Sequence, residues 1–136
     1  MRQFLLLAIL LILTACSATP ERSPILSEIP DKSVPQSYSK LRLRARDYAI
    51  SITEASHKDD WPRLEQLASG LEQTADLLLK ADNTPEMHKG NLAMLSSELR
   101  KQAKELMVAA QAKDSGKVTE VLTSINRKVR EMRDTK

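Results

Sequence analysis

Few side chains in this sequence are of the types that carry out chemistry. It contains one Cys, Cys16, and two His, His57 and His88. Glu54 and His57 form one Glu-x-x-His pair, whereas the di-iron sites built in helical-bundle cores use two such pairs, so a site of this kind is not expected. No Ser stands in a Gly-x-Ser-x-Gly turn, the context that exposes a nucleophilic hydroxyl. The sequence therefore offers no catalytic constellation, and we expect a protein that is not an enzyme.

Cys16 needs an explanation of its own, because a single Cys cannot form an intramolecular disulfide. It follows Arg2, an apolar run over residues 4–13 and two short side chains. A basic start, a short apolar run and small residues at the cut are typical of a secretory signal. The ten apolar residues are too few to cross a bilayer, which takes about 20 residues in a helix. We therefore expect residues 1–15 to be a signal peptide that is removed.

The residues that lead up to this Cys read Leu13-Thr14-Ala15-Cys16, which resembles the lipobox of bacterial lipoproteins. The resemblance implies that a diacylglyceryl thioether forms on Cys16, that the signal is cut before it, and that the new amine receives an acyl chain such as palmitate. Each buried CH₂ contributes about 0.8 kcal/mol, so several acyl chains make the attachment effectively permanent. Ser17 in place of Asp implies the outer membrane, facing the periplasm, with the inner membrane as the alternative.

Residues 16–36 form a predicted tether. They contain four of the chain's six prolines, Pro20, Pro24, Pro30 and Pro35. Proline at this density blocks helix and sheet alike, so we expect an extended segment. At about 3.1 Å per residue it reaches up to roughly 60 Å from the lipid surface. We assign it no binding role of its own.

The pattern changes to that of a helix after Pro35. Apolar residues recur at alternating steps of three and four, which predicts four amphipathic helices over about 37–56, 61–81, 85–113 and 114–136. The predicted core positions are Leu41, Ala45, Tyr48, Ile52 and Ala55; Leu64, Leu67, Leu71, Ala75 and Leu78; Leu92, Leu95, Leu99, Ala103, Leu106 and Ala110; and Val118, Val121, Leu122, Ile125, Val129 and Met132.

Helix starts are marked by capping residues. Asp60 followed by Pro62 predicts a cap with Pro in the first turn. Thr84 stands before a Pro that suits the first helical position, so we expect it to cap the third helix. Asp114 or Ser115 opens the last helix.

Four such helices joined by short turns favour one domain, because short connections force neighbouring helices to run in opposite directions. The sequence thus predicts an all-α fold over residues 37–136, an antiparallel up-down-up-down four-helix bundle. The low content of Gly, 3 residues, and of aromatics, 3%, agrees with helix over sheet. We expect Tyr48 and Trp61 to be the main aromatic side chains of the core.

The helical part also resembles a known group of proteins. The motif His-Lys-Asp-Asp-Trp at residues 57–61, with the Leu and Ala spacing after it, is similar to the first loop and second helix of cytochrome c-prime-like proteins. Residues 99–122 resemble their third helix, turn and fourth helix. Residues 85–87 and 116–118 also resemble the soluble periplasmic four-helix cytochrome b. The resemblance covers roughly residues 37–136 and implies a four-helix bundle.

The haem-binding residues of those families are missing. Cytochrome c-prime holds haem through Cys-x-x-Cys-His near the end of its last helix, where this chain has Val129-Arg130-Glu131-Met132-Arg133. No thiol is available there for a thioether bond. The Met on the first helix and the His on the last helix of the cytochrome b have no counterpart here. We therefore interpret the domain as a haemless relative or a convergent bundle, with no cofactor and no family residue carried over.

The two His are expected at opposite ends of the domain, His57 at the end of the first helix and His88 near the start of the third. They cannot share one ion, so we interpret both as surface residues and predict no metal site. The alternative is that His88 with Met132, and with Met87 as a further ligand, holds a b-type haem or copper(I).

The charge balance is nearly even. After removal of the signal, 20 basic and 18 acidic side chains remain, a net charge of +2. This argues against nucleic acid as a partner, which would require a concentrated basic face. Lys40, Arg42, Arg44 and Arg46 form a basic cluster that a helix spreads over two faces. Its ordinary interpretation is solvated charge, and the alternative is contact with anionic lipid headgroups or cell-wall polymer.

Together these patterns predict a membrane-anchored periplasmic lipoprotein that acts as a non-catalytic binding or scaffolding module. We expect contact with the membrane through lipid on Cys16 and with an envelope protein partner, and we identify no small-molecule substrate. The alternative is a haem- or metal-binding cytochrome-like protein in electron transfer or metal handling.

Overall fold

The computed structural model describes residues 34–133. The predicted signal, Cys16 and the tether up to residue 33 lie outside the described residues, as do residues 134–136. Between residues 34 and 133 the chain forms α-helices and no strand, which confirms the all-α class. No helix in this part is long and apolar enough to cross a membrane. The helices are α2 (Tyr38–His57), α3 (Trp61–Leu78), α4 (Glu86–Lys89), α5 (Leu92–Gln111) and α6 (Ser115–Glu131).

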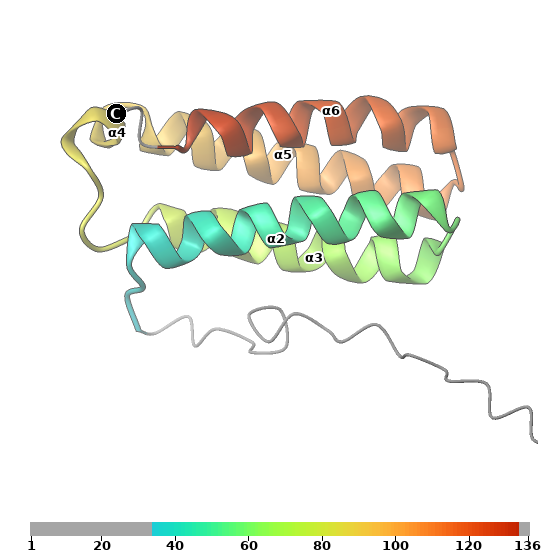
Figure 1. The fold of residues 1–136 in the computed structure, drawn as a ribbon, viewed down its shortest axis with the longest axis horizontal. Coiled ribbons are helices and arrows are strands. Elements are labelled where there is room, and N and C mark those ends of the chain that lie inside the picture. The colour runs from blue at the N-terminus through green and yellow to red at the C-terminus, as the bar shows by residue number, and fades with distance from the viewer. Residues whose placement is uncertain (1–33, 134–136) are drawn as a thin grey trace, which may run out of the picture.

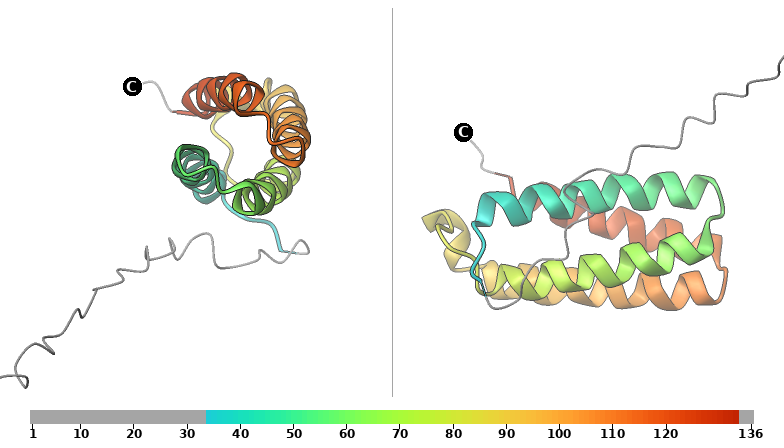
Figure 2. Two further views of the ribbon diagram at one scale, coloured as in Figure 1. Left: turned by 90° about the vertical axis from the view of Figure 1, so that its right-hand side faces the viewer. Right: turned by 90° about the horizontal axis from the view of Figure 1, so that it is seen from below.

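The four long helices lie side by side around one core (Figure 1). Helix α3 packs against α2 and α5, and α6 packs against α5 and α2, so that each long helix has two neighbours. Figure 2 shows the four helices end-on around their common core. The α2–α3 and α5–α6 turns lie together at one end, the hairpin end (Figure 1). The start of α2, the short α4 and the end of α6 lie at the opposite end, the α4 end.

Side-chain caps start three of the long helices. Asp60 accepts a hydrogen bond from the backbone N–H of Arg63 at 3.2 Å, and Asp114 accepts one from that of Lys117 at 2.9 Å. An acidic cap was predicted before Trp61, and Asp114 was one of the two residues expected to open the last helix. Both caps satisfy backbone N–H groups that have no partner inside the helix. Ser37 caps α2 in the same way.

The predicted apolar stripes form the core. All of the predicted core positions are buried except Leu92 and Leu122, which are half-buried and pack against the buried cluster. Full burial of a Leu or Ile side chain contributes roughly 1.5–3 kcal/mol. Burial of the stripes from all four long helices therefore supplies the main force that holds these helices together.

The aromatic side chains are placed differently from the prediction. Tyr48 is buried as expected, but Trp61 is only half-buried at the edge of the core, and Tyr38 is almost completely buried instead. The ring of Tyr48 lies directly on Gly70 of α3, where an added Cβ would stand 2.6 Å from its Cε1 atom. Gly70 thus allows α2 and α3 to approach closely at this point.

The predicted third helix is wrong in one respect, because it is split in two. Helix α4 ends at Lys89 and α5 begins at Leu92. Gly90 and Asn91 separate them, and both residue types disfavour a helix interior. Thr84 does not cap either piece, since its hydroxyl donates to the carbonyl of Ala81 at 3.3 Å. Pro85 stands at the N-cap of α4 rather than inside the first turn.

A backbone clasp ties the start of the domain to the connection between α3 and α4. The N–H of Asp82 donates to the carbonyl of Gln36, and the N–H of Tyr38 donates to the carbonyl of Asp82, both at 2.9 Å. The two bonds form an isolated parallel bridge between Ser37 and Asp82. The chain that leads into α2 is therefore fixed at the α4 end.

Candidate functional site: a basic groove between α2 and α6

A groove of about 370 Å³ runs between α2 and α6 near the α4 end. Among the described residues, three arginines and two apolar residues line it. Its lining residues are Arg42, Leu43 and Arg46 from α2, Val129 from α6, and Arg133, which follows the end of α6.

The helical repeat explains why these residues meet. Arg42 and Arg46 are one turn apart on α2, and residues four apart on a helix share a face. Val129 belongs to the last turn of α6, and Arg133 follows the C-cap of that helix. Val129 is buried, whereas Arg133 projects at the exposed edge of the same seam. The groove thus follows the line along which the buried stripes of α2 and α6 come to the surface.

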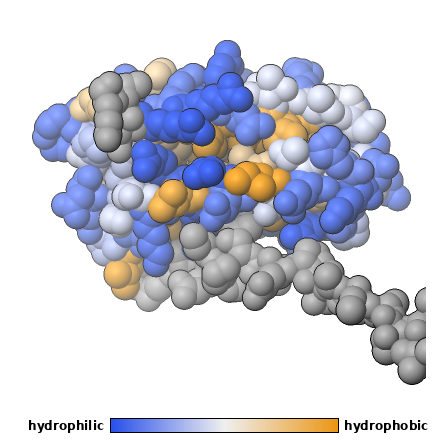
Figure 3. All heavy atoms as spheres, in the orientation of Figure 1, coloured by the Kyte–Doolittle hydropathy of each residue, from blue (hydrophilic) through white to orange (hydrophobic). Residues whose placement is uncertain are grey.

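Much of the positive charge in the groove has no opposite charge beside it. Among residues 34–133, neither Arg46 nor Arg133 forms an ion pair, and both side chains are exposed. Leu43 between the two arginines of α2 keeps 40% of its surface exposed. Figure 3 shows the face that carries α2 and α6, which is largely hydrophilic with small apolar patches. The groove therefore combines guanidinium groups with an accessible apolar surface.

The predicted basic cluster on α2 is divided between two environments. Arg42 and Arg46 line the groove, whereas Arg44 is buried with its guanidinium 5.8 Å from the centre of the Tyr48 ring. Lys40 is exposed in the first turn. The expectation of solvated charge is therefore wrong for Arg44, which is buried against Tyr48. The sequence also did not indicate that Arg133, beyond the end of α6, would join the groove.

Lys128 of α6 is paired with carboxylates. Lys128 binds Glu98 of α5 and lies 3.0 Å from Glu131, and only 14% of its side chain is exposed. The hydrogen bonds to Glu98 and Glu131 raise the pKa of Lys128 above its ordinary value of 10.5. Lys128 is therefore a paired cation, in contrast to Arg46 and Arg133.

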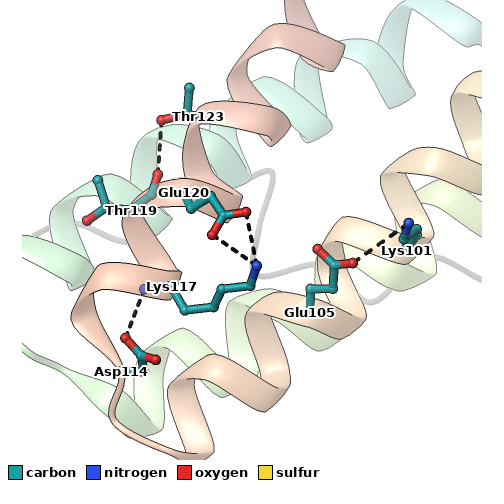
Figure 4. Close-up of polar contacts among 7 residues, drawn as sticks. All are labelled: Lys101, Glu105, Asp114, Lys117, Thr119, Glu120 and Thr123. Atoms are coloured by element: carbon teal, nitrogen blue, oxygen red, sulfur yellow. Dashed lines mark hydrogen bonds and ion pairs between the residues drawn. The ribbon is translucent and has the colours of Figure 1, made fainter.

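Two lysines away from the groove, Lys117 of α6 and Lys101 of α5, are also paired with carboxylates (Figure 4). Lys117 donates to both carboxylate oxygens of Glu120 at 3.0 Å, and the hydrogen bond to Glu120 raises its pKa. Lys101 lies 3.9 Å from Glu105 on α5.

The residues considered for haem or copper meet only in part. His88 was predicted to be a surface residue, but it is buried, with 6% of its surface exposed. The short helix α4 turns it inward, where it stacks on the Tyr38 ring with centroids 5.3 Å apart. Tyr38 in turn donates its hydroxyl to the carbonyl oxygen of Met132 at 3.0 Å. The phase that His88 shares with Leu95 was the sequence signal for this burial.

The remaining residues do not complete such a site. Met87 is 52% exposed beside His88, and His57 is exposed at the far hairpin end. Across residues 34–133, no three His, Cys, Asp or Glu side chains are grouped so as to hold a metal ion. Val129 and Met132, which the resemblance to cytochrome c-prime would place at its haem thiols, are buried and fill the core. The residues present do not fit a haem of the cytochrome c-prime kind.

Comparison of the chain with protein-family models, with curated proteins and with solved structures gives no match.

Proposed function

We propose that this chain is a lipid-anchored, non-catalytic binding or scaffolding module of the bacterial envelope, held at the periplasmic face of the outer membrane. The observation that carries the proposal is the arginine groove between α2 and α6, whose Arg46 and Arg133 have no ion-pair partner among residues 34–133. A surface that collects like charges stores repulsion, and an anionic partner relieves it. The proposed anchor rests on the lipobox-like motif that ends at Cys16.

For the fold of the module we propose an antiparallel up-down-up-down four-helix bundle. The supporting observation is that each long helix packs against two others, in the cyclic order α2, α3, α5, α6. The turns at residues 58–60 and 112–114 are short enough to force antiparallel neighbours. We also propose that the domain is similar to a cytochrome c-prime-like bundle without haem. The cyclic packing of the four long helices supports this part of the proposal.

Labelling with a fatty acid tests the anchor. The full chain expressed in a Gram-negative host should incorporate labelled palmitate, and Cys16→Ser should incorporate none and should retain its signal. Normal labelling of that variant would show that the proposed anchor is wrong. Ser17→Asp serves as a matched variant, because it should keep the label and move the protein from the outer to the inner membrane.

Cross-linking tests the binding role. The intact lipoprotein, carrying a photo-reactive group in the groove, should give reproducible cross-links to one envelope component in membranes. The same group placed at Ala112, at the hairpin end, should not give them. Equal cross-linking from both positions would mean that the groove is not the binding surface.

A further inference from the structure

The basic groove lies at the end of the domain where the anchored chain arrives. Arg42 and Arg46 belong to the first half of α2, and Arg133 follows the last turn of α6. The backbone clasp between Gln36 and Asp82 fixes the incoming chain at the same end. Lipid on Cys16 would therefore hold this end of the domain nearer to the bilayer than the hairpin end.

The proposed tether is short enough to keep the domain close to the membrane. Residues 16–36 span about 25 Å as a coil and roughly 60 Å when fully extended. A surface so tethered meets the bilayer at an effective concentration of about millimolar. Under this condition, an interaction that is weak between free partners is enough to hold the domain down.

The chemistry of the groove suits phospholipid headgroups. The planar guanidinium group offers paired N–H donors that match the oxygens of a phosphate. Three arginines are arranged around the groove, and the exposed side chain of Leu43 lies among them. A cation next to an apolar side chain is the combination that favours the interface of an anionic bilayer, where acyl chains lie below the phosphates.

We propose that the groove lined by Arg42, Arg46 and Arg133 docks on anionic phospholipid of the membrane that holds the anchor, so that the domain lies on the bilayer with α2 and α6 facing it. This inference rests on the proposed function, because the tether must hold the groove close to the lipid. Each basic side chain near an anionic surface increases binding about fivefold. Loss of all three arginines should therefore reduce the docked population about 100-fold relative to the undocked one.

Quenching in proteoliposomes tests the docking with the intact lipoprotein. Cys16 is committed to lipid, so Ser39→Cys supplies a single free thiol for a fluorophore on the groove face of α2, and Ala112→Cys supplies one at the hairpin end. Both labelled proteins are placed in vesicles of phosphatidylcholine, with or without phosphatidylglycerol, that carry a spin-labelled quenching lipid. The label at residue 39 should be quenched only when phosphatidylglycerol is present, and the label at residue 112 in neither case.

Variants without the charged side chains show whether the groove causes the quenching that depends on phosphatidylglycerol. The variant Arg42→Gln, Arg46→Gln, Arg133→Gln should lose the quenching that depends on phosphatidylglycerol. The control variant Lys58→Gln, Lys80→Gln, Lys113→Gln removes the same charge elsewhere and should keep it. Circular dichroism confirms that both remain folded. The proposal is overturned if the two variants lose quenching equally, or if phosphatidylglycerol has no effect on the parent.

Two further outcomes separate this inference from the proposed function. A protein that floats with the vesicles but shows no docking retains its anchor, and only the lipid contact is then wrong. A protein that does not float with them contradicts the anchor itself. Arginine-dependent cross-links to an acidic envelope protein, without docking on vesicles, would assign the groove to that protein and overturn the lipid contact.

Discussion

Tyr38 joins three elements at the α4 end, because its ring stacks on His88 while its hydroxyl binds the carbonyl oxygen of Met132 at 3.0 Å. Tyr38 is in the first turn of α2, His88 is in α4, and Met132 is the C-cap of α6. All three residues are buried. The Tyr38 side chain thus connects α2, α4 and the end of α6 and covers the core at the α4 end.

Removal of the Tyr38 hydroxyl tests this closure. Tyr38→Phe keeps the ring on His88 but leaves the carbonyl of Met132 without its donor, so we expect a loss of about 1–3 kcal/mol in the free energy of unfolding. Urea denaturation followed by circular dichroism measures it. Unchanged stability would mean that water or another donor replaces the hydroxyl at no cost.

Substitution by Ala should have opposite effects on stability at Gly70, where space is lacking, and at Gly90, where it is open. At Gly70 the new methyl would overlap the Tyr48 ring, so Gly70→Ala should destabilise the domain by about 1–3 kcal/mol. At Gly90 an added Cβ meets nothing within 4 Å, and the backbone has a φ of −65°. Gly90→Ala should therefore stabilise the domain by about 0.5–1 kcal/mol. Thermal melts of both variants check the predicted difference in sign.

A charge in the centre of the core should abolish the fold. Leu99 and Leu106 on α5 have no exposed surface. An unpaired carboxylate there costs several kcal/mol, compared with a total stability of about 5–15 kcal/mol for such a domain. We expect Leu99→Asp and Leu106→Asp to lose the cooperative melt. Glu98→Gln, next to the first site but half-exposed, is the control that should keep it.

Lys128 should make the free energy of unfolding decrease with pH in the alkaline range. Its hydrogen bonds to Glu98 and Glu131 raise its pKa in the folded state above the unfolded value of 10.5. The folded state therefore holds this proton more tightly, so the stabilisation is complete below pH 10.5 and disappears as the pH rises through the raised pKa. Lys128→Gln should cost about 1 kcal/mol at neutral pH and much less at strongly alkaline pH. Urea denaturation at the two pH values measures this convergence, and a constant difference would contradict it.

The haem alternative has a direct spectroscopic test. Because the positions of the thiols are taken by buried Val129 and Met132, we expect no Soret band in protein purified from the periplasm of a haem-replete host. Stoichiometric haem that is lost on His88→Ala would contradict this expectation. It would also make the pair of His88 and Met132 the first candidate for its ligands.

The core was predictable because burial repeats with the period of the helix. Leu99, Ala103 and Leu106 could be assigned to one face from spacing alone, and Asp60 and Asp114 are caps because their side chains act on the next few residues. Such signals are local. They need no knowledge of which helix lies beside which.

The parts that were missed depend on contacts between segments distant in sequence. Arg133 joins Arg42 and Arg46 only because α6 packs against α2, which the spacing along either helix does not reveal. The phase that His88 shares with Leu95 favoured burial, but its residue type favoured a surface position. The contact with Tyr38, which is distant in sequence, holds His88 in the buried position.

The clasp between Gln36 and Asp82 also decides how the domain carries mechanical load. Tension that arrives along the chain from the N-terminal side reaches two backbone hydrogen bonds before it reaches the body of α2. Part of the force passes through Asp82 into the connection between α3 and α4, so that two segments share it. The two hydrogen bonds thus fasten the chain where it enters the domain, so that a pull from the N-terminal side must break them before it unwinds the first turn of α2.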